Sequence, residues 1–199
     1  MNTRTYQATV KQEKREAILD GSLKNFIKKG YANTSVADIA LTSNVSLATL
    51  YKHYRAKEEI FEDAIHEAWE RVEGAYKLPE TKGLSLAGAL TEVARHYIAF
   101  LHRRDVGKLM GVCLAPLGLP KPMGHLLYKS IIEPTRHHLE AIVTPHLPED
   151  QVEMRVRLFL SALNDMLVWP LFTLGLKDIP ATSVETVISY AVADICQKN

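Results

Sequence analysis

The sequence predicts an all-α protein in which a small N-terminal helix-turn-helix domain of three helices precedes a larger helical body. Two observations carry this prediction. Apolar residues recur at a spacing of three or four along most of the 199-residue chain, as they do on the buried face of a helix. No segment has the alternating pattern and regular turn spacing that indicate a sheet.

Composition narrows the class of protein further. The chain is 47% hydrophobic and 24% charged, which is typical of a globular protein. Its two cysteines, Cys113 and Cys196, are too few and too far apart for a disulfide framework or a zinc ribbon, and they fit a reduced compartment. The N-terminus lacks the apolar region of a signal peptide, and no apolar run approaches the ~20 residues that span a bilayer. We therefore expect a cytoplasmic protein.

Charge is distributed unevenly along the chain. Residues 1–57 hold ten Lys or Arg and four Asp or Glu, a net charge of +6, whereas residues 58–199 have a net charge of −5. A basic head on an acidic body suggests that only the head meets a polyanion. Chance clustering of lysines on a solvated face is the alternative explanation.

The first helix is predicted from Lys11 to Lys29, since its apolar residues share one face. Residues 1–10 are polar and are expected to fray. Gly30 supplies a stop after the helix. Gly21 lies inside it and costs roughly 1 kcal/mol relative to Ala, which a close helix crossing at that position would offset.

Residues 34–61 contain two short helices separated by a tight turn. Thr34 or Ser35 caps a helix that ends near Ser43. Asn44 tolerates a positive φ and therefore suits the turn.

The second short helix is predicted from Leu47 to His53, with Ser46 as its cap. Two helices joined in this way form a helix-turn-helix, whose second helix can enter the DNA major groove.

The rest of the chain is predicted to be helical. Pro134 and Pro170 are expected to kink or end their helices, because proline removes a backbone donor. The expected helices lie at about 56–76, 85–102, 105–114, 123–143, 151–174 and 183–197.

The N-terminal 60 or so residues resemble the TetR family of bacterial transcriptional repressors; the remainder matches that family only in length and helical character. The chain departs from the family pattern at Asn44, where Gly is frequent, at Ala48, again in place of Gly, and at Ala56, where a capping Ser is common. The last departure forfeits about 1 kcal/mol of capping. The resemblance rests on Ile18, Leu19, Phe26, Gly30, Tyr31, Thr34, Ser35, Val36, Asp38, Ile39, Ala40, Val45, Ser46, Thr49, Leu50, Tyr51, Tyr54, Lys57 and Glu58.

The resemblance implies a DNA-binding domain over residues 1–57 and an effector-binding and dimerisation domain over residues 58–199. It also places the helix 47–53 in the major groove. That helix lacks Arg, Asn and Gln, the best bidentate base readers, so specificity would depend on apolar contacts, water and DNA shape. The implied DNA-binding residues are Thr34, Ser35, Ser46, Leu47, Ala48, Thr49, Tyr51, Lys52, His53 and Lys57.

The resemblance further implies a homodimer formed through the helices at about 151–174 and 183–197, and a pocket for a small, largely apolar effector. Each candidate pocket residue would equally serve as ordinary core. A bound ligand would shift the helix after residue 56 and so separate the two reading helices. The candidates are Tyr97, Phe100, Met110, Cys113, Met123, Leu127, Tyr128, Asn164, Trp169 and Phe172.

The implied function is that of a ligand-responsive repressor that binds a palindromic operator in double-stranded DNA. A ligand-binding or scaffold protein with a non-functional DNA reader is the first alternative, and an all-helical enzyme is the second. The chain has no HExxH, CxxC or GxSxG pattern and no glycine-rich phosphate loop. We therefore predict no catalytic residue, metal or cofactor.

Overall fold

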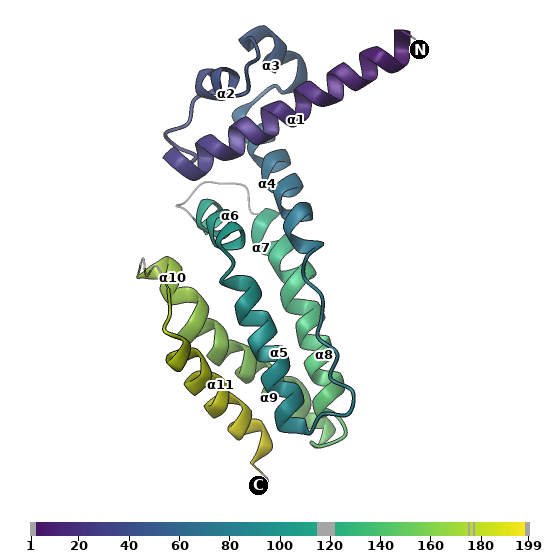
Figure 1. The fold of residues 1–199 in the computed structure, drawn as a ribbon, viewed down its shortest axis with the longest axis vertical. Coiled ribbons are helices and arrows are strands. Elements are labelled where there is room, and N and C mark those ends of the chain that lie inside the picture. The colour runs from purple at the N-terminus through teal and green to yellow at the C-terminus, as the bar shows by residue number, and fades with distance from the viewer. Residues whose placement is uncertain (1–2, 115–121, 175, 177, 198–199) are drawn as a thin grey trace. The chain divides into compact units, whose positions relative to one another are not determined.

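A computed structural model describes residues 3–114, 122–174, 176 and 178–197, and every regular element among them is a helix (Figure 1). The predicted all-α fold is thereby confirmed. Within these residues, no helix combines the length and the apolar character needed to cross a bilayer.

The chain forms two compact units, which are described separately. The first comprises Met1–Val72 with Lys108–Leu126, and the second comprises Glu73–Gly107 with Leu127–Asn199. The predicted functional division after residue 57 stays a prediction. In chain order the elements are α1 (Thr3–Lys29), α2 (Val36–Thr42), α3 (Leu47–His53), α4 (Lys57–Glu73), α5 (Leu86–Leu101), α6 (Arg104–Leu114), α7 (Pro122–Leu127), the π-helical turn η1 (Tyr128–Ile132), α8 (Glu133–Val143), α9 (Glu149–Leu163), the π-helical turn η2 (Asn164–Val168), α10 (Trp169–Thr173) and α11 (Ala181–Cys196).

Helix α1 begins at Thr3 rather than near Lys11, so the expectation that residues 1–10 fray was wrong for residues 3–10, and residues 1–2 lie outside the described residues. The segment contains neither glycine nor proline before Gly21, and most of its residues from Gln7 onward are good helix formers. The Gln12 side chain also donates to the Glu16 carboxylate one turn later, at 2.9 Å.

Gly21, the glycine inside α1, lies where α1 and the end of α2 cross closely. Such a crossing was expected, because a glycine within a helix is otherwise destabilising. A Cβ added at Gly21 would lie 2.2 Å from the Ser43 Oγ, and 3.1 Å and 3.2 Å from the Ser43 backbone N and Cα. Only a residue without a side chain allows the end of α2 to approach α1 this closely. Asn25, one turn further along α1, donates to the Thr42 hydroxyl at 2.9 Å and so holds the same crossing.

In the second unit, Pro134 and Pro170, the two prolines expected to kink or end a helix, each lie just after a π-helical turn. The Glu133 N–H bonds to the Tyr128 carbonyl before Pro134, and the Trp169 N–H bonds to the Asn164 carbonyl before Pro170. The proline withdraws one donor from the helical ladder, and the wider turn accommodates the loss.

Helix α5 fastens the second of these turns. The Tyr97 hydroxyl donates to the Asn164 Oδ1 at 2.9 Å, and the His102 Nε2 lies 2.8 Å from the Leu167 carbonyl oxygen. Both acceptors belong to η2, so the irregular turn is held by side chains from a regular helix.

Replacing Gly21 with Ala is expected to destabilise the protein by about 1–3 kcal/mol, the usual cost of overpacking. Gly107→Ala is the matched control, because its Cβ would meet nothing within 4 Å; it should stabilise α6 by ~0.5–1 kcal/mol. Urea unfolding followed by circular dichroism measures both. Ser43→Ala should partly rescue the first variant, since it removes the closest atom. Equal stability of Gly21→Ala and wild type would contradict the crossing.

Candidate nucleic-acid interface

Helix α2 begins at a complete capping box. The Asp38 N–H donates to the Ser35 Oγ at 3.0 Å, and the Ser35 N–H donates to the Asp38 carboxylate at 3.0 Å. Lys29 binds the same carboxylate at 2.8 Å. The pKa of Asp38 is well below its usual range, first because of Lys29 and then because of the two Ser35 donors. The start of α2 is therefore fixed to the end of α1.

The turn between α2 and α3 depends on Asn44. Its φ is +52°, and it is the one non-glycine residue with positive φ within the described part of the chain. The next N–H, that of Val45, donates to the Ala40 carbonyl at 3.0 Å and closes the turn. Ser46 then caps α3 by accepting from the Thr49 N–H at 3.1 Å. The predicted bounds of α3 are confirmed to the residue.

Helix α3 is anchored along one side only. Leu50 is fully buried, and Tyr54, which directly follows the helix, is 5% exposed. Leu47 and Tyr51 are large side chains that are 45% and 57% exposed, and Ala48 and Lys52 are exposed beside them. Exposed apolar side chains next to a cation suit contact with thymine methyl groups and phosphate.

Two of the predicted DNA-binding residues direct their polar groups inward. Thr34 is only 2% exposed, and its hydroxyl donates to the Gly30 carbonyl at 2.8 Å. The Lys57 Nζ donates to the carbonyls of Tyr31 and Thr34, each at 3.0 Å, and lies 4.1 Å from the Tyr31 ring centroid. Lys57 thus ties the start of α4 to the segment between α1 and α2.

An ion-pair network joins α1 to α4. Arg15 contacts the Asp63 carboxylate at 2.8 Å, which also accepts from the Tyr54 hydroxyl at 3.1 Å. Arg71 binds Asp20 at 2.9 Å and also pairs with Glu67. These contacts place the end of α3 against α1 and α4, so α3 has a defined orientation within its unit.

The first turn of α4 has a substitute for the missing capping serine. The Glu59 carboxylate accepts from the Arg55 N–H at 2.9 Å. The Glu58 carboxylate accepts from the Tyr31 hydroxyl at 2.7 Å, which lowers the pKa of Glu58. Side chains inside the helix therefore take the place of a cap at Ala56.

The predicted effector residues differ in burial, and their role stays a prediction. Tyr97, Phe100 and Met110 are buried, while Tyr128 and Trp169 are largely exposed. Within the described residues, Tyr97 and Asn164 are joined by a hydrogen bond, in which the tyrosine hydroxyl donates to the amide oxygen. Leu127 and Phe172 are half-buried. The side chains of Cys113 and Met123 lie outside the described residues.

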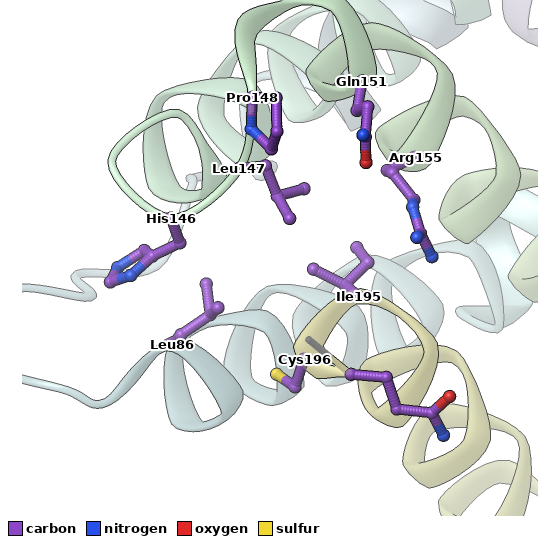
Figure 2. Close-up of a pocket in the computed structure, with 9 residues that line it drawn as sticks. Leu86, His146, Leu147, Pro148, Gln151, Arg155, Ile195 and Cys196 are labelled. Atoms are coloured by element: carbon purple, nitrogen blue, oxygen red, sulfur yellow. The ribbon is translucent and has the colours of Figure 1, made fainter. Parts of the chain in front are cut away.

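A different cavity, which the sequence did not indicate, lies in the second unit where α5 begins and α11 ends. Its volume is about 480 Å³. Figure 2 shows Leu147 and Ile195 directed toward its centre and Arg155 at its edge. The Arg155 Nη1 bonds to the Asp194 carbonyl at 3.1 Å, so this cation already has a partner.

The second unit also has an apolar groove between α9 and α11, of about 510 Å³. Leu158, Met166 and Tyr190 line it, and they are 54%, 56% and 76% exposed. No group of three or more His, Cys, Asp or Glu side chains suited to a metal ion occurs within the described residues.

The N-terminal part of the chain is similar to known proteins. Residues 18–64 match the family model described as bacterial regulatory proteins, tetR family. A negative transcriptional regulator of the biofilm operon icaADBC, IcaR, from Staphylococcus aureus strain Newman is 26% identical over 92 residues, which are 46% of this chain and 50% of that protein. IcaR from Staphylococcus epidermidis is 37% identical over 51 residues, 26% of this chain and 28% of the relative. The chain thus spans about half the length, or less, of the curated relatives it matches.

Solved structures share the fold over nearly the whole chain. The flavonoid-responsive regulator FrrA has a TM-score of 0.67 at 25% identity, covering 92% of this chain and 94% of its own. A TetR-family regulator from Mesorhizobium loti has a TM-score of 0.65 at 23% identity, covering 93% and 96%. At 23% identity, the similarity to the Mesorhizobium loti structure shows a shared fold and nothing more. Together with the family match, these findings confirm the resemblance on which the sequence interpretation rested.

Replacing Lys57 with Met is expected to lower stability by about 1–2 kcal/mol, because two partly buried carbonyls lose their donor. Lys52→Met, at an exposed position of α3, should change stability by less than ~0.5 kcal/mol but reduce the salt dependence of DNA binding by roughly 0.9 in log–log slope. Thermal melting and fluorescence anisotropy with labelled duplex DNA measure the two effects. If Lys57→Met melts like the wild type yet weakens DNA binding as much as Lys52→Met, the Lys57 ammonium faces phosphate instead.

Proposed function

We propose, since this chain is a TetR-family transcriptional regulator, that it is a repressor in the cytoplasm that binds a palindromic operator as a homodimer and is released by a small, largely apolar effector. The single observation that carries the DNA-binding part is the exposed surface of α3, with Leu47, Tyr51 and Lys52 presented outward from one buried anchor, Leu50. The negative regulators matched over the same segment support repression.

The DNA surface that we propose is centred on the start and outer face of α3. Ser46 and Thr49 present hydroxyls that hydrogen-bond to each other at 2.9 Å, and either can bond in addition to a phosphate or a base edge. Ser35 lies at the start of α2, where a helix N-terminus favours a phosphate. Thr34 and Lys57 support this surface from behind. His53 closes it at the end of α3.

Dimerisation places two such surfaces on one DNA duplex. The groove between α9 and α11 exposes Leu158, Met166 and Tyr190, more large apolar surface than a solvated helix pair needs. A twofold partner would bury the same patch on both copies, as an isologous interface requires. Joining two weak readers raises the effective concentration of the second and selects a palindrome.

Release requires a ligand that prefers one arrangement of the dimer over the other. The flavonoid-responsive neighbour supports a small, aromatic effector for this fold. Tyr97 and Asn164 are the groups that we expect such an effector to engage, because the buried Tyr97 hydroxyl and the half-buried Asn164 amide form a polar pair beside apolar side chains. An effector hydroxyl that replaced either partner would loosen the hold of α5 on η2.

A ligand-binding or scaffold protein with a non-functional reader is the competing function. The capping box of α2, the Ser46 cap of α3 and the positive φ at Asn44 argue against it, because they maintain the geometry of the helix-turn-helix. The relatives and the family are transcriptional regulators rather than enzymes.

A gel-shift titration with the DNA upstream of the protein's own gene tests the function. We expect a complex that survives excess unrelated DNA and weakens steeply with salt, because phosphate contacts release counterions. Ala in place of Tyr51 should abolish the preference for that DNA while leaving melting unchanged. A wild-type chain that binds the upstream DNA no better than unrelated DNA would refute the proposal.

The dimer interface is tested by Leu158→Glu, which places a charge in the apolar groove. Light scattering after gel filtration should show a monomer, and operator affinity should fall by more than tenfold as avidity is lost. Leu84→Glu is the matched control, since Leu84 is 50% exposed but lies outside the groove. A dimer that persists with Glu at position 158 would move the interface elsewhere.

A further inference from the structure

The N-terminal half of α1 (residues 3–16) lies outside the core of its unit. Among the side chains of α1 that the structure describes, Ile18 is the first that is fully buried, whereas Lys11, Gln12, Glu13 and Lys14 are all exposed. Figure 1 shows these turns projecting as a single helix. A helical segment with so little packing is stable only if the free energy of forming the helix is small or if a partner contacts it.

The contacts of Arg15 place this segment beside the end of the reading helix. The Arg15 Nη2 lies 2.8 Å from the Asp63 carboxylate, and the Tyr54 hydroxyl donates to that same carboxylate at 3.1 Å. Tyr54 directly follows His53, the last residue of α3. Lys11 lies one turn before Arg15 on the same side of α1. The lysine therefore extends toward the surface on which α3 ends.

The cations of this unit fall into two groups. Arg15, Lys29 and Arg71 form ion pairs with carboxylates, and the Lys57 ammonium is bound by two carbonyls. These four hold the fold together. Lys11, Lys14 and Lys52, by contrast, make no ion pair with a carboxylate within the described residues. Their charge is available to an external anion.

His53 lies among these available cations. Its side chain is half-buried, and its pKa is lowered from the ordinary 6.5, first by burial and then by repulsion from Lys11, Lys14 and Arg15. On its own helix it follows Lys52, and from α4 the Asp63 carboxylate approaches through Tyr54. The ring is therefore mainly neutral at pH 7 in the free protein.

We propose that Lys11 and Lys14 of α1 join His53 in one phosphate-binding surface beside the reading helix, and that His53 takes up a proton from solvent when a DNA phosphate occupies it. This inference rests on the proposed function, and it adds two residues of α1 and a linked proton to the DNA site. A bound phosphate offsets the repulsion from the lysines and favours the imidazolium, so the pKa of His53 rises on binding.

The sign of the pH effect follows from this linkage. Between the pKa of free His53, which is below 6.5, and its higher value in the complex, the imidazole of the complex is protonated to a greater extent than that of the free protein. DNA affinity must therefore rise as the pH falls through that window. Above the pKa of the complex, His53 is neutral in both states and the effect disappears.

The proton linkage is tested with the full-length protein and a fluorescein-labelled duplex of about 30 base pairs of mixed sequence. Anisotropy titrations at constant ionic strength should show binding about two- to sixfold tighter at pH 6 than at pH 8, the range expected for a pKa rise of about one unit from a value below 6.5. His53→Gln should remove most of this difference. If His53→Gln retains the pH dependence of the wild type, the linkage is wrong.

The lysines are tested by the salt dependence of binding to the same duplex. Lys11→Gln and Lys14→Gln should each reduce the log–log slope by roughly 0.9, the value for one lost phosphate contact. Lys24→Gln is the matched control, because Lys24 is exposed on the face of α1 opposite its buried residues. Slopes for Lys11→Gln and Lys14→Gln that equal the slope of Lys24→Gln would exclude α1 from the interface.

Two further readouts separate this inference from neighbouring explanations. Thermal melting shows whether a variant remains folded, and a purely structural role of Lys11 or Lys14 would change melting without changing the salt slope. A wild-type chain with no salt-dependent DNA binding would overturn both the proposed function and this inference. Wild-type binding that is insensitive to the α1 lysines and to His53 would overturn the inference alone.

Discussion

The DNA-facing surface is built on two helices of seven residues each, and helices of that length are not stable by themselves in water. Their geometry must therefore be imposed from outside. Caps at Ser35 and Ser46 satisfy free N–H groups at both starts, and Ile39 and Leu50 anchor each helix in the core. The remaining features of the first unit are best understood as means of holding these two helices in place.

The closest of these contacts is the crossing of α1 and α2 at Gly21. The absence of a side chain there lets Ser43 approach to a distance that no Cβ would permit. The Ser43 hydroxyl has no hydrogen-bond partner in the described chain, so the close approach is made at some cost in polar satisfaction. The close packing of this turn against α1 offsets the lost hydrogen bond. The same packing fixes the direction in which α3 leaves the turn.

Local chemistry explains which parts of this structure were predictable from the sequence. Cap residues and Asn44 act within a few positions, so the bounds of α3 and the turn before it followed from neighbouring residues alone. The Lys57 side chain turns inward because its ammonium donates to backbone carbonyls more than 20 residues away in the sequence. The π-helical turn η2 is held by hydrogen bonds from the side chains of Tyr97 and His102. Such contacts join segments that are far apart in the sequence, and the spacing of apolar residues does not predict them. The start of α1 differs from the expectation for another reason. The residues before Lys11 are polar, but polarity alone does not prevent a helix when most of the residues that follow are good helix formers.

The arrangement of α5 and η2 gives the body a feature suited to switching. In the π-helical turn η2, the Trp169 N–H bonds to the carbonyl of the residue five positions earlier, Asn164. The next residue, Pro170, has no N–H to donate to the regular helical pattern. Two contacts, through Tyr97 and His102, maintain η2. The two side chains belong to α5 and to the residue that directly follows it, and η2 directly continues α9, which lines the apolar groove. Under the function that we propose, a ligand that displaced either bond would therefore act on η2 and, through it, on α9, without requiring a chain of small displacements through the core.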